Sequence, residues 1–332
     1  MRIIHIDKQS VTPIYKQIVA AVEEAIVRKK WRKHDRLPSV NKVCLENGVS
    51  RDTVLTAYEI LKKQGVIYAH LGKGYFVKSE DLSYTQRYFL LFDELNAFKE
   101  DIYNAFLEAL GSKAQVDIFF HHFNLGLFRK MIDDAAGSYS KYILMPSNME
   151  GVEEIIAQLP RQDVLILDQT RPSLQQYPSI YQNFVRAMYS ALTLAATRLE
   201  PYTQLVLLFP GQKEPLGMVT GFEQFCRDFG KRYTIQSHFE LSQLERGTVF
   251  VIPDDRDLVR VVEKSQEYGL EIGSDVGIIS YNDTPLKKVV ARGITTISTD
   301  FTAMGKRLAS WVNTQDFIQE ENPSRLLLRH SL

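Results

Sequence analysis

Residues 37–66 read LPSVNKVCLENGVSRDTVLTAYEILKKQGV, and this stretch decides the fold of the N-terminal part of the chain. Its apolar residues recur at helical spacing in two segments, which meet at Asn47-Gly48, a pair that tolerates a left-handed backbone and ends a helix. Ser39 and Ser50 each precede one segment, where a serine oxygen caps the free amides of a first helical turn. The stretch therefore predicts two helices joined by a tight turn, a helix-turn-helix.

The second of these helices is expected to meet DNA through its first turn. Its apolar residues point inward, so the turn around Arg51 projects from the helix end, where a guanidinium can contact a guanine edge with two hydrogen bonds. The sequence that follows predicts a β-hairpin with a glycine-rich basic tip at residues 70–74, suited to a phosphate or the minor groove. The predicted DNA contacts are Arg36, Ser39, Asn41, Lys42, Ser50, Arg51, Asp52, Thr53, Leu71, Gly72 and Lys73.

The order and spacing of these segments resemble the N-terminal domain of GntR-family transcription regulators. The resemblance covers residues 12–77, in the segments TPIYKQI, LPSV, GVSRDTV, AYEILKKQGVI and GKGYFV. It implies a winged helix-turn-helix that binds operator DNA. The chain departs from the pattern at Asn41, where many such domains carry arginine, and at Leu55, where some do, so a different operator is expected.

Charge separates the chain into two unlike parts. The 332 residues carry no net charge, yet residues 1–78 contain 15 lysines and arginines against 7 acids, and residues 79–332 contain 25 against 33. A run of charge is often only a solvated face. Because this excess lies in the same part as the helix-turn-helix, we interpret it as a surface that follows DNA phosphates.

Composition bounds the remaining classes of protein. Residues 1–7 are too short and polar for a signal sequence, and no apolar run approaches the roughly 20 residues of a membrane span, so no membrane partner is expected. The two cysteines, Cys44 and Cys226, predict no disulfide framework and fit a reduced, cytoplasmic environment. We expect a DNA-binding domain at residues 1–78, a polar linker at 79–86 and an effector-binding and dimerisation domain at 87–332.

Beyond the linker, β-rich runs alternate with amphipathic helical stretches, which predicts a multidomain α/β chain with parallel sheets. The strand candidates are residues 88–92, 116–120, 142–145, 164–167, 205–209, 233–236, 248–252 and 276–280. DVGIISYNDTP from Asp275, GITTIS, MGKRLA and the closing SRLLLRHS resemble the effector domain of LacI-type regulators. The resemblance implies a periplasmic-binding-protein fold, with lobe 1 at about 87–183 and 299–318 and lobe 2 at about 184–298 and 319–332.

Ligands of open α/β sheets bind against the loops that leave the carboxyl ends of strands. Residues predicted there to bind the effector are Asp93, Asn96, Phe98, Asp168, Gln169, Gln212, Lys213, His238, Asp254, Asp255 and Asn282. Carboxylates, amides and an aromatic ring suit the hydroxyls and the C–H face of a sugar. Other roles stay open, since Asp168, Asp254 and Asp255 also suit helix caps, Phe98 suits a core, and Lys213 suits a phosphate.

No arrangement of residues in the sequence indicates catalysis, a metal site or a cofactor. His121-His122 lacks a metal-ligand spacing, no GxSxG motif is present, and residues 211–217 do not form a P-loop. The enzymatic rival is the GntR subclass fused to an aminotransferase-like domain that binds pyridoxal phosphate. The part of the chain after residue 78 is short for that domain, and its LacI-like ending argues against it.

These observations predict a ligand-responsive repressor of a carbohydrate-use operon that works as a homodimer on operator DNA. Effector binding would close the two lobes and change the spacing of the DNA-binding domains. The layout is similar to that of arabinose-sensing repressors and of regulators of fucose use, so a pentose or deoxyhexose such as L-arabinose or L-fucose is the expected monosaccharide. A regulator of a nucleoside or phosphorylated metabolite, and an architectural DNA binder without a ligand, are the alternatives.

Overall fold

The computed structural model describes residues 4–8, 10, 12–80, 86–111, 114–211, 213–314 and 316–332, apart from the side chain of Lys63. The chain divides into two compact units. The first is Met1–Tyr88 with Ser112–Gln115 and Ala135–Ser140, and the second comprises Phe89–Gly111, Val116–Asp134 and Lys141–Leu332. Most of the predicted linker lies outside the described residues. Gln86, which the sequence placed in that linker, instead opens a strand whose first residues are polar and exposed.

Residues 1–78, called the head below, form three helices and a hairpin. The elements are α1 (Ile14–Val27), α2 (Val40–Asn47), α3 (Arg51–Lys63), β1 (Ile67–His70) and β2 (Gly74–Val77). The strands pair antiparallel, with Ile67 opposite Val77. Buried apolar residues of the three helices and the hairpin, among them Ile18, Val54 and Tyr58, form one core, because each helix presents one apolar face inward. The predicted helix-turn-helix and hairpin are confirmed.

The predicted capping residues set the ends of α2 and α3. The Ser39 hydroxyl accepts a hydrogen bond from the Lys42 amide, and the Ser50 hydroxyl accepts one from the Thr53 amide, each at 3.2 Å. Gly48 ends α2 at a φ of 61°, where a residue with a Cβ would be strained. The turn between the two helices is therefore determined by short-range sequence.

Lobe 1, most of which belongs to the second unit, is a six-stranded sheet in the order β13-β7-β6-β5-β3-β4. Its strands are β3 (Gln86–Phe92), β4 (Ala114–Phe120), β5 (Lys141–Leu144), β6 (Val164–Asp168), β7 (Ser179–Tyr181) and β13 (Gln319–Glu321), and its helices are α4 (Ala97–Leu110), α5 (Leu125–Ala135), α6 (Val152–Ile156) and α11 (Phe301–Thr314). The prediction that lobe 2 takes residues 319–332 is wrong for β13, which pairs in parallel with β7. Residues 319–321 are too short a strand for their sequence to specify which sheet they join.

Lobe 2 is a second six-stranded sheet in the order β14-β12-β11-β10-β8-β9. Its strands are β8 (Gln204–Leu208), β9 (Arg232–Gln236), β10 (Thr248–Ile252), β11 (Val276–Tyr281), β12 (Thr295–Thr299) and β14 (Ser324–Leu327), and its helices are α7 (Phe184–Leu194), α8 (Ala196–Leu199), α9 (Gly217–Asp228) and α10 (Asp255–Glu267). The strands pair in parallel except β14, which runs antiparallel to β12. Single 3₁₀ turns are η2 (Arg161–Asp163), η3 (Pro172–Leu174), η4 (Leu241–Gln243), η5 (Leu286–Lys288) and η6 (Val290–Arg292).

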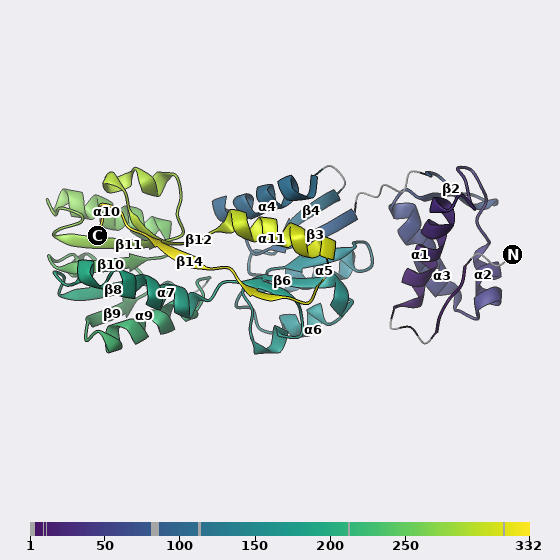
Figure 1. Ribbon diagram of the computed structural model, residues 1–332. Coiled ribbons are helices and arrows are strands. Elements are labelled where there is room, and N and C mark those ends of the chain that lie inside the picture. The colour runs from purple at the N-terminus through teal and green to yellow at the C-terminus, as the bar shows by residue number, and fades with distance from the viewer. Residues whose placement is uncertain are drawn as a thin grey trace. The chain divides into compact units, whose positions relative to one another are not determined.

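Three crossing segments join the two lobes. The chain crosses between β7 and α7, between β12 and α11, and between β13 and β14. Figure 1 shows the long yellow ribbon of the third segment passing from one sheet to the other. Within the part of the chain that the structure describes, no helix has the length and apolar character needed to cross a bilayer.

Candidate ligand pocket and nucleic-acid interface

A cavity of about 290 Å³ lies between the two lobes. Its walls come mainly from loops that leave the carboxyl ends of parallel strands, β3 and β6 in lobe 1 and β8, β10 and β11 in lobe 2. Ligands of open α/β sheets generally bind at the carboxyl ends of the strands, so these loops are the expected place for a ligand. The lining residues are Asp93, Glu94, Asn96, Phe98, Lys99, Phe123, Asp168, Gln169, Gln182, Phe184, Lys213, Glu214, Pro215, Met218, Pro253, Asp254, Asp255, Tyr281, Asn282 and Phe301.

A buried lysine between two buried carboxylates forms the lobe 1 wall. The Lys99 ammonium lies 3.5 Å from a carboxylate oxygen of Asp93 and 3.5 Å from one of Asp168. Burial alone would lower the pKa of Lys99, but the charges of Asp168 and Asp93 outweigh it and raise the pKa above its ordinary value. Lys99 is therefore a cation whose charge is balanced by these two carboxylates of the protein.

Asn282, at the end of β11, offers a buried acceptor to the cavity. Its backbone adopts a φ of 60°, and its backbone amide donates to the Ile297 carbonyl at 2.7 Å. The buried side-chain oxygen of Asn282 has no hydrogen-bond partner within the described residues. A buried acceptor without a donor is costly, so a ligand hydroxyl at this position would satisfy it.

Lys287 holds the loop around Asn282 from behind. Its buried ammonium donates to the carbonyls of Tyr281 and Asn282, at 2.8 and 3.0 Å, and pairs with Asp255 at 2.7 Å. Burial lowers the pKa of Lys287.

Asp168, at the end of β6 in lobe 1, has a φ of 73°, and Asn282 after β11 in lobe 2 has a φ of 60°. Both lobes therefore place a residue with a left-handed backbone at a strand end in the pocket.

Aromatic rings cover part of the cavity wall. Phe98 stacks on Phe301 with ring centroids 5.3 Å apart, and Phe184 lies 6.3 Å from Tyr281. Burial raises the pKa of the Tyr281 hydroxyl, which therefore stays protonated. Phe98 is half-buried and combines the two roles considered for it, since it packs on another ring and also borders the cavity.

Two contacts cross the cavity from lobe 2 to lobe 1. The Lys213 ammonium donates to the Glu94 carboxylate at 2.6 Å and lies 5.2 Å from the centre of the Phe123 ring. Asn148 donates its side-chain amide to the Glu214 carbonyl at 3.1 Å. Both lysines that line the cavity, Lys99 and Lys213, are thus paired with carboxylates of the protein.

The structure brings nine of the eleven predicted effector residues to this one cavity. They are Asp93, Asn96, Phe98, Asp168, Gln169, Lys213, Asp254, Asp255 and Asn282. Gln212 lies outside the described residues. His238 is not in the lining, because it follows β9, the edge strand of its sheet, and its imidazole lies 3.5 Å from Asp257 instead.

Helix capping and pocket lining prove compatible at two predicted positions. Asn96 accepts from the Lys99 amide at 3.1 Å, and one oxygen of Asp254 accepts from the Arg256 and Asp257 amides at 2.9 and 3.0 Å. Both residues also border the cavity. The two readings of Asp254 are therefore not exclusive.

Sequence reasoning missed Lys99 and Gln182. Lys99 carried a signal, because it stands in the first turn of α4, where the helix dipole disfavours a cation unless acids lie near. Gln182 gave no local signal, since its role depends on residues far away in the sequence. Across the described ranges, no group of three or more His, Cys, Asp and Glu residues is placed to hold a metal ion.

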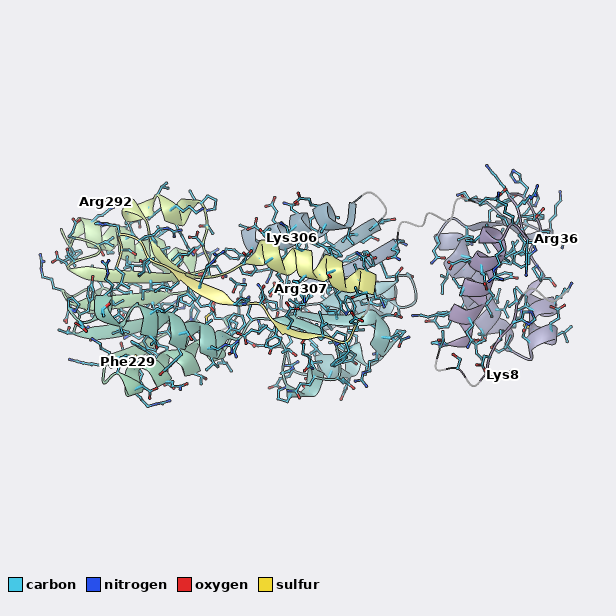
Figure 2. All side chains as sticks on the ribbon, in the orientation of Figure 1. Lys8, Arg36, Phe229, Arg292, Lys306 and Arg307 are labelled. Carbon is cyan, nitrogen blue, oxygen red and sulfur yellow. The ribbon has the colours of Figure 1, made fainter. Side chains whose placement is uncertain are left out.

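The predicted DNA contacts gather on the exposed surface of the head. Leu71 and Lys73 lie at the tip of the hairpin, where Leu71 is 98% exposed. The backbone of Arg36 forms an antiparallel β-bridge with Phe76 of β2. The Arg36 side chain lies beside Gly74, since a Cβ added to that glycine would be 3.5 Å from the Arg36 Nε. Figure 2 shows Arg36 in the head together with Lys8, whose ammonium donates to the Gly48 carbonyl at 2.9 Å. Of the predicted contacts, Thr53 is half-buried and the others are exposed.

Comparisons with known proteins match two different families to two different parts of the chain. The family model "Bacterial regulatory proteins, gntR family" matches residues 14–77, and "Periplasmic binding protein-like domain" matches residues 223–328. The chain is 30% identical over 106 residues to the HTH-type transcriptional repressor YtrA of Bacillus subtilis (strain 168), which covers 32% of this chain and 78% of that protein.

Solved structures resemble the second unit in fold. A LacI family transcriptional regulator from Bifidobacterium animalis subsp. lactis superposes with a TM-score of 0.62 at 15% identity, covering 75% of this chain and 98% of that one. A LacI family regulator from Enterococcus faecium, solved with bound ribose, gives a TM-score of 0.59 at 14% identity and covers 74% and 98%. At these identities the likeness concerns the fold alone.

Proposed function

This chain belongs to the gntR family of bacterial regulatory proteins, and from that premise we propose that it is a repressor whose DNA binding responds to a monosaccharide. The observation that carries the proposal is the interlobe cavity, lined by carboxylates, amides and aromatic rings. Carboxylates and amides hydrogen-bond vicinal hydroxyls, and a ring packs on the C–H face of a sugar. We propose that the gene it controls serves carbohydrate use.

The charges of the cavity favour an uncharged ligand over a phosphorylated one. Lys99 is shared by two carboxylates, and Lys213 is paired with Glu94, so neither ammonium is available to an anion without losing its present partner. The unpartnered oxygen of Asn282 requires a donor, which a sugar hydroxyl supplies and an ionised phosphate group does not. A pentose or deoxyhexose such as L-arabinose or L-fucose meets both conditions.

A phosphorylated sugar remains the second candidate, and Lys213 is the observation that favours it. Its side chain is half exposed and comes from a loop, so the pair with Glu94 could exchange for a pair with a phosphate. A solvated ion pair contributes little to stability, so the exchange would cost little. Lys213→Gln separates the candidates, because it would abolish binding of a sugar phosphate and leave a neutral sugar bound.

For DNA, we propose that the first turn of α3 enters the major groove and that the β1–β2 tip lies at the neighbouring backbone or minor groove. Arg51 would read a guanine, while Arg36, Lys42 and Lys73 would contact phosphates. The protein would act in the cytoplasm as a homodimer on a near-palindromic operator. A ligand shifts such a dimer between two states only through its different affinities for them.

A thermal-shift screen of neutral monosaccharides and their phosphates tests the proposal. A pocket ligand at 100 times its dissociation constant adds about 2.7 kcal/mol to the stability of the folded state. Arg51→Ala should keep this stabilisation and weaken operator binding, whereas Asn282→Ala should lose the stabilisation and keep operator binding. Stabilisation by none of the sugars, with DNA binding intact, would favour an architectural DNA binder and contradict the proposal.

A further inference from the structure

A chain of short hydrogen bonds runs from the pocket to all three crossing segments. The Gln182 amide donates to the Asp168 carboxylate at 2.5 Å, and the Thr299 hydroxyl donates to the Gln182 side-chain oxygen at 2.5 Å. The hydroxyls of Thr299 and Ser324 lie 2.6 Å apart. We call these four residues the hinge chain. Gln182 follows β7, Thr299 ends β12 and Ser324 opens β14, so the chain takes one residue from each crossing segment.

The donors and acceptors of the hinge chain are ordered in one direction. Asp168, as a carboxylate, only accepts, so Gln182 presents its amino group to Asp168 and its oxygen to Thr299. The single hydroxyl proton of Thr299 is then committed to Gln182, and the Ser324 hydroxyl must donate to Thr299. Each link therefore depends on the one before it, starting from the pocket carboxylate.

Burial makes the hinge chain stiff. Asp168, Gln182 and Thr299 are 4%, 7% and 6% exposed, so little water is available to replace a lost partner. A movement of Asp168 either moves the next residues with it or leaves a buried polar group unsatisfied. Asp168 and Gln182 line the cavity, whereas Thr299 and Ser324 lie outside its lining. The second half of the chain can therefore carry a response without contacting a ligand.

We propose that the hinge chain transmits occupancy of the pocket to the angle between the lobes, with Thr299 as its positioning residue. The proposal rests on the function proposed above, in that a ligand contacts Asp168. Ligand hydroxyls that share the Asp168 carboxylate reposition Gln182, and Thr299 and Ser324 follow it across the second and third crossing segments. Cutting the chain at Thr299 then separates binding from closure.

The crossing segments also contain a brace that is not connected to the pocket, and it supplies a matched control. Asn322 donates its backbone amide to the Tyr181 carbonyl at 2.7 Å and its side-chain amide to the Asp300 carbonyl at 3.0 Å. Asn322 is as buried as Thr299, and it touches the same three segments. Asn322→Ala removes a contact of this hinge and leaves the hinge chain whole.

The test measures the distance between lobes with spin labels. Lys130→Cys on α5 and Gln224→Cys on α9 place exposed labels on lobe 1 and lobe 2, in a Cys44→Ser background and diluted with unlabelled protein. D-ribose, L-arabinose and L-fucose serve as probes, with their affinities measured by calorimetry. Thr299→Val cuts the hinge chain at nearly constant shape, Thr299→Ser restores its hydroxyl, and Ser324→Ala cuts the last link if Thr299→Val does not fold.

We expect a binding sugar to shift the interlobe distance in the parent protein, in Thr299→Ser and in Asn322→Ala. Thr299→Val should bind the same sugar within about threefold of the parent affinity, and its distance should not shift. A full shift in Thr299→Val would overturn the hinge chain. If no probe binds the parent, the proposal of a sugar ligand fails separately from the hinge chain. The interlobe distance distributions measured without ligand then test the hinge chain. A broader distribution in Thr299→Val than in Thr299→Ser supports the hinge chain, and equal widths refute it.

Discussion

Replacing Lys99 by methionine removes the buried cation between Asp93 and Asp168 and keeps most of the side-chain volume. The three side chains are 8%, 8% and 6% exposed, so both carboxylates would stay in a poorly hydrated site. Breaking a buried ion pair typically costs about 3–5 kcal/mol. Asp93 keeps a bond from the Ser147 hydroxyl at 3.2 Å, and Asp168 keeps its bond from Gln182, so we expect the lower end of that range.

Urea unfolding followed by tryptophan fluorescence measures this loss. Trp311 lies in α11 of lobe 1, and Trp31→Phe removes the signal of the head. For a domain of this size, 1 kcal/mol corresponds to a shift of about 2–4 °C in the melting temperature, so calorimetry should show a decrease of about 6–12 °C. Lys141→Met breaks another buried pair of lobe 1, with Asp163 at 3.2 Å, and serves as a control that should spare sugar binding.

The pH dependence gives the prediction its sign. The pKa of Lys99 is raised above the ordinary value of 10.5, so its contribution to the free energy of unfolding is complete below pH 10.5. The contribution is lost as the pH rises through the raised pKa. The stability difference between the parent and Lys99→Met should therefore be constant from pH 7 to 10 and shrink above that. A difference below about 1 kcal/mol at pH 7, the range of solvated pairs, would refute the reasoning.

Four further expectations concern single side chains. Arg51→Ala should weaken binding to an operator fragment about tenfold to a hundredfold by fluorescence anisotropy, with an unchanged melting temperature. Gly305→Ala should destabilise the protein by about 1–3 kcal/mol in urea, because the new Cβ would lie 2.4 Å from the Ile102 carbonyl oxygen. Since burial raises the pKa of the Cys226 thiol to about 12, mass spectrometry should find it unmodified by iodoacetamide in the native protein at pH 8. Asp254→Ala should cost about 1 kcal/mol as a lost helix cap, and equal stabilisation by sugar in variant and parent would restrict Asp254 to capping.

The head was predictable from sequence almost completely, because its determinants are local. Ser39, Gly48 and Ser50 act within three or four residues of their own positions, and the hairpin follows directly after α3. A helix cap and a left-handed glycine keep the same meaning in any surroundings. The same locality explains why eight of the twelve strands described in the two lobes were also recognised in order, whereas the three-residue strands β7 and β13 were not among the candidates.

The pocket was predictable only as far as one topological rule reaches. Residues after parallel strands were expected to converge, and nine of them border one cavity. The rule failed for His238, because the spacing of the strands along the chain does not specify their order in the sheet, and β9 lies at its edge. Gln182 and Thr299 are 117 residues apart, and no local pattern connects them. Contacts of this kind depend on the assembled fold.

The left-handed backbone at Asp168 and Asn282 restricts how this pocket can change in evolution. Among side chains with a Cβ, asparagine and aspartate tolerate such a φ best, and glycine would remove the polar group altogether. Substitutions at either position are thus confined to exchanging aspartate and asparagine, or to glycine, which removes the polar side chain. A change in what the pocket accepts therefore has to come from other lining positions, such as Phe98 and Lys213, while Asp168 and Asn282 stay nearly fixed.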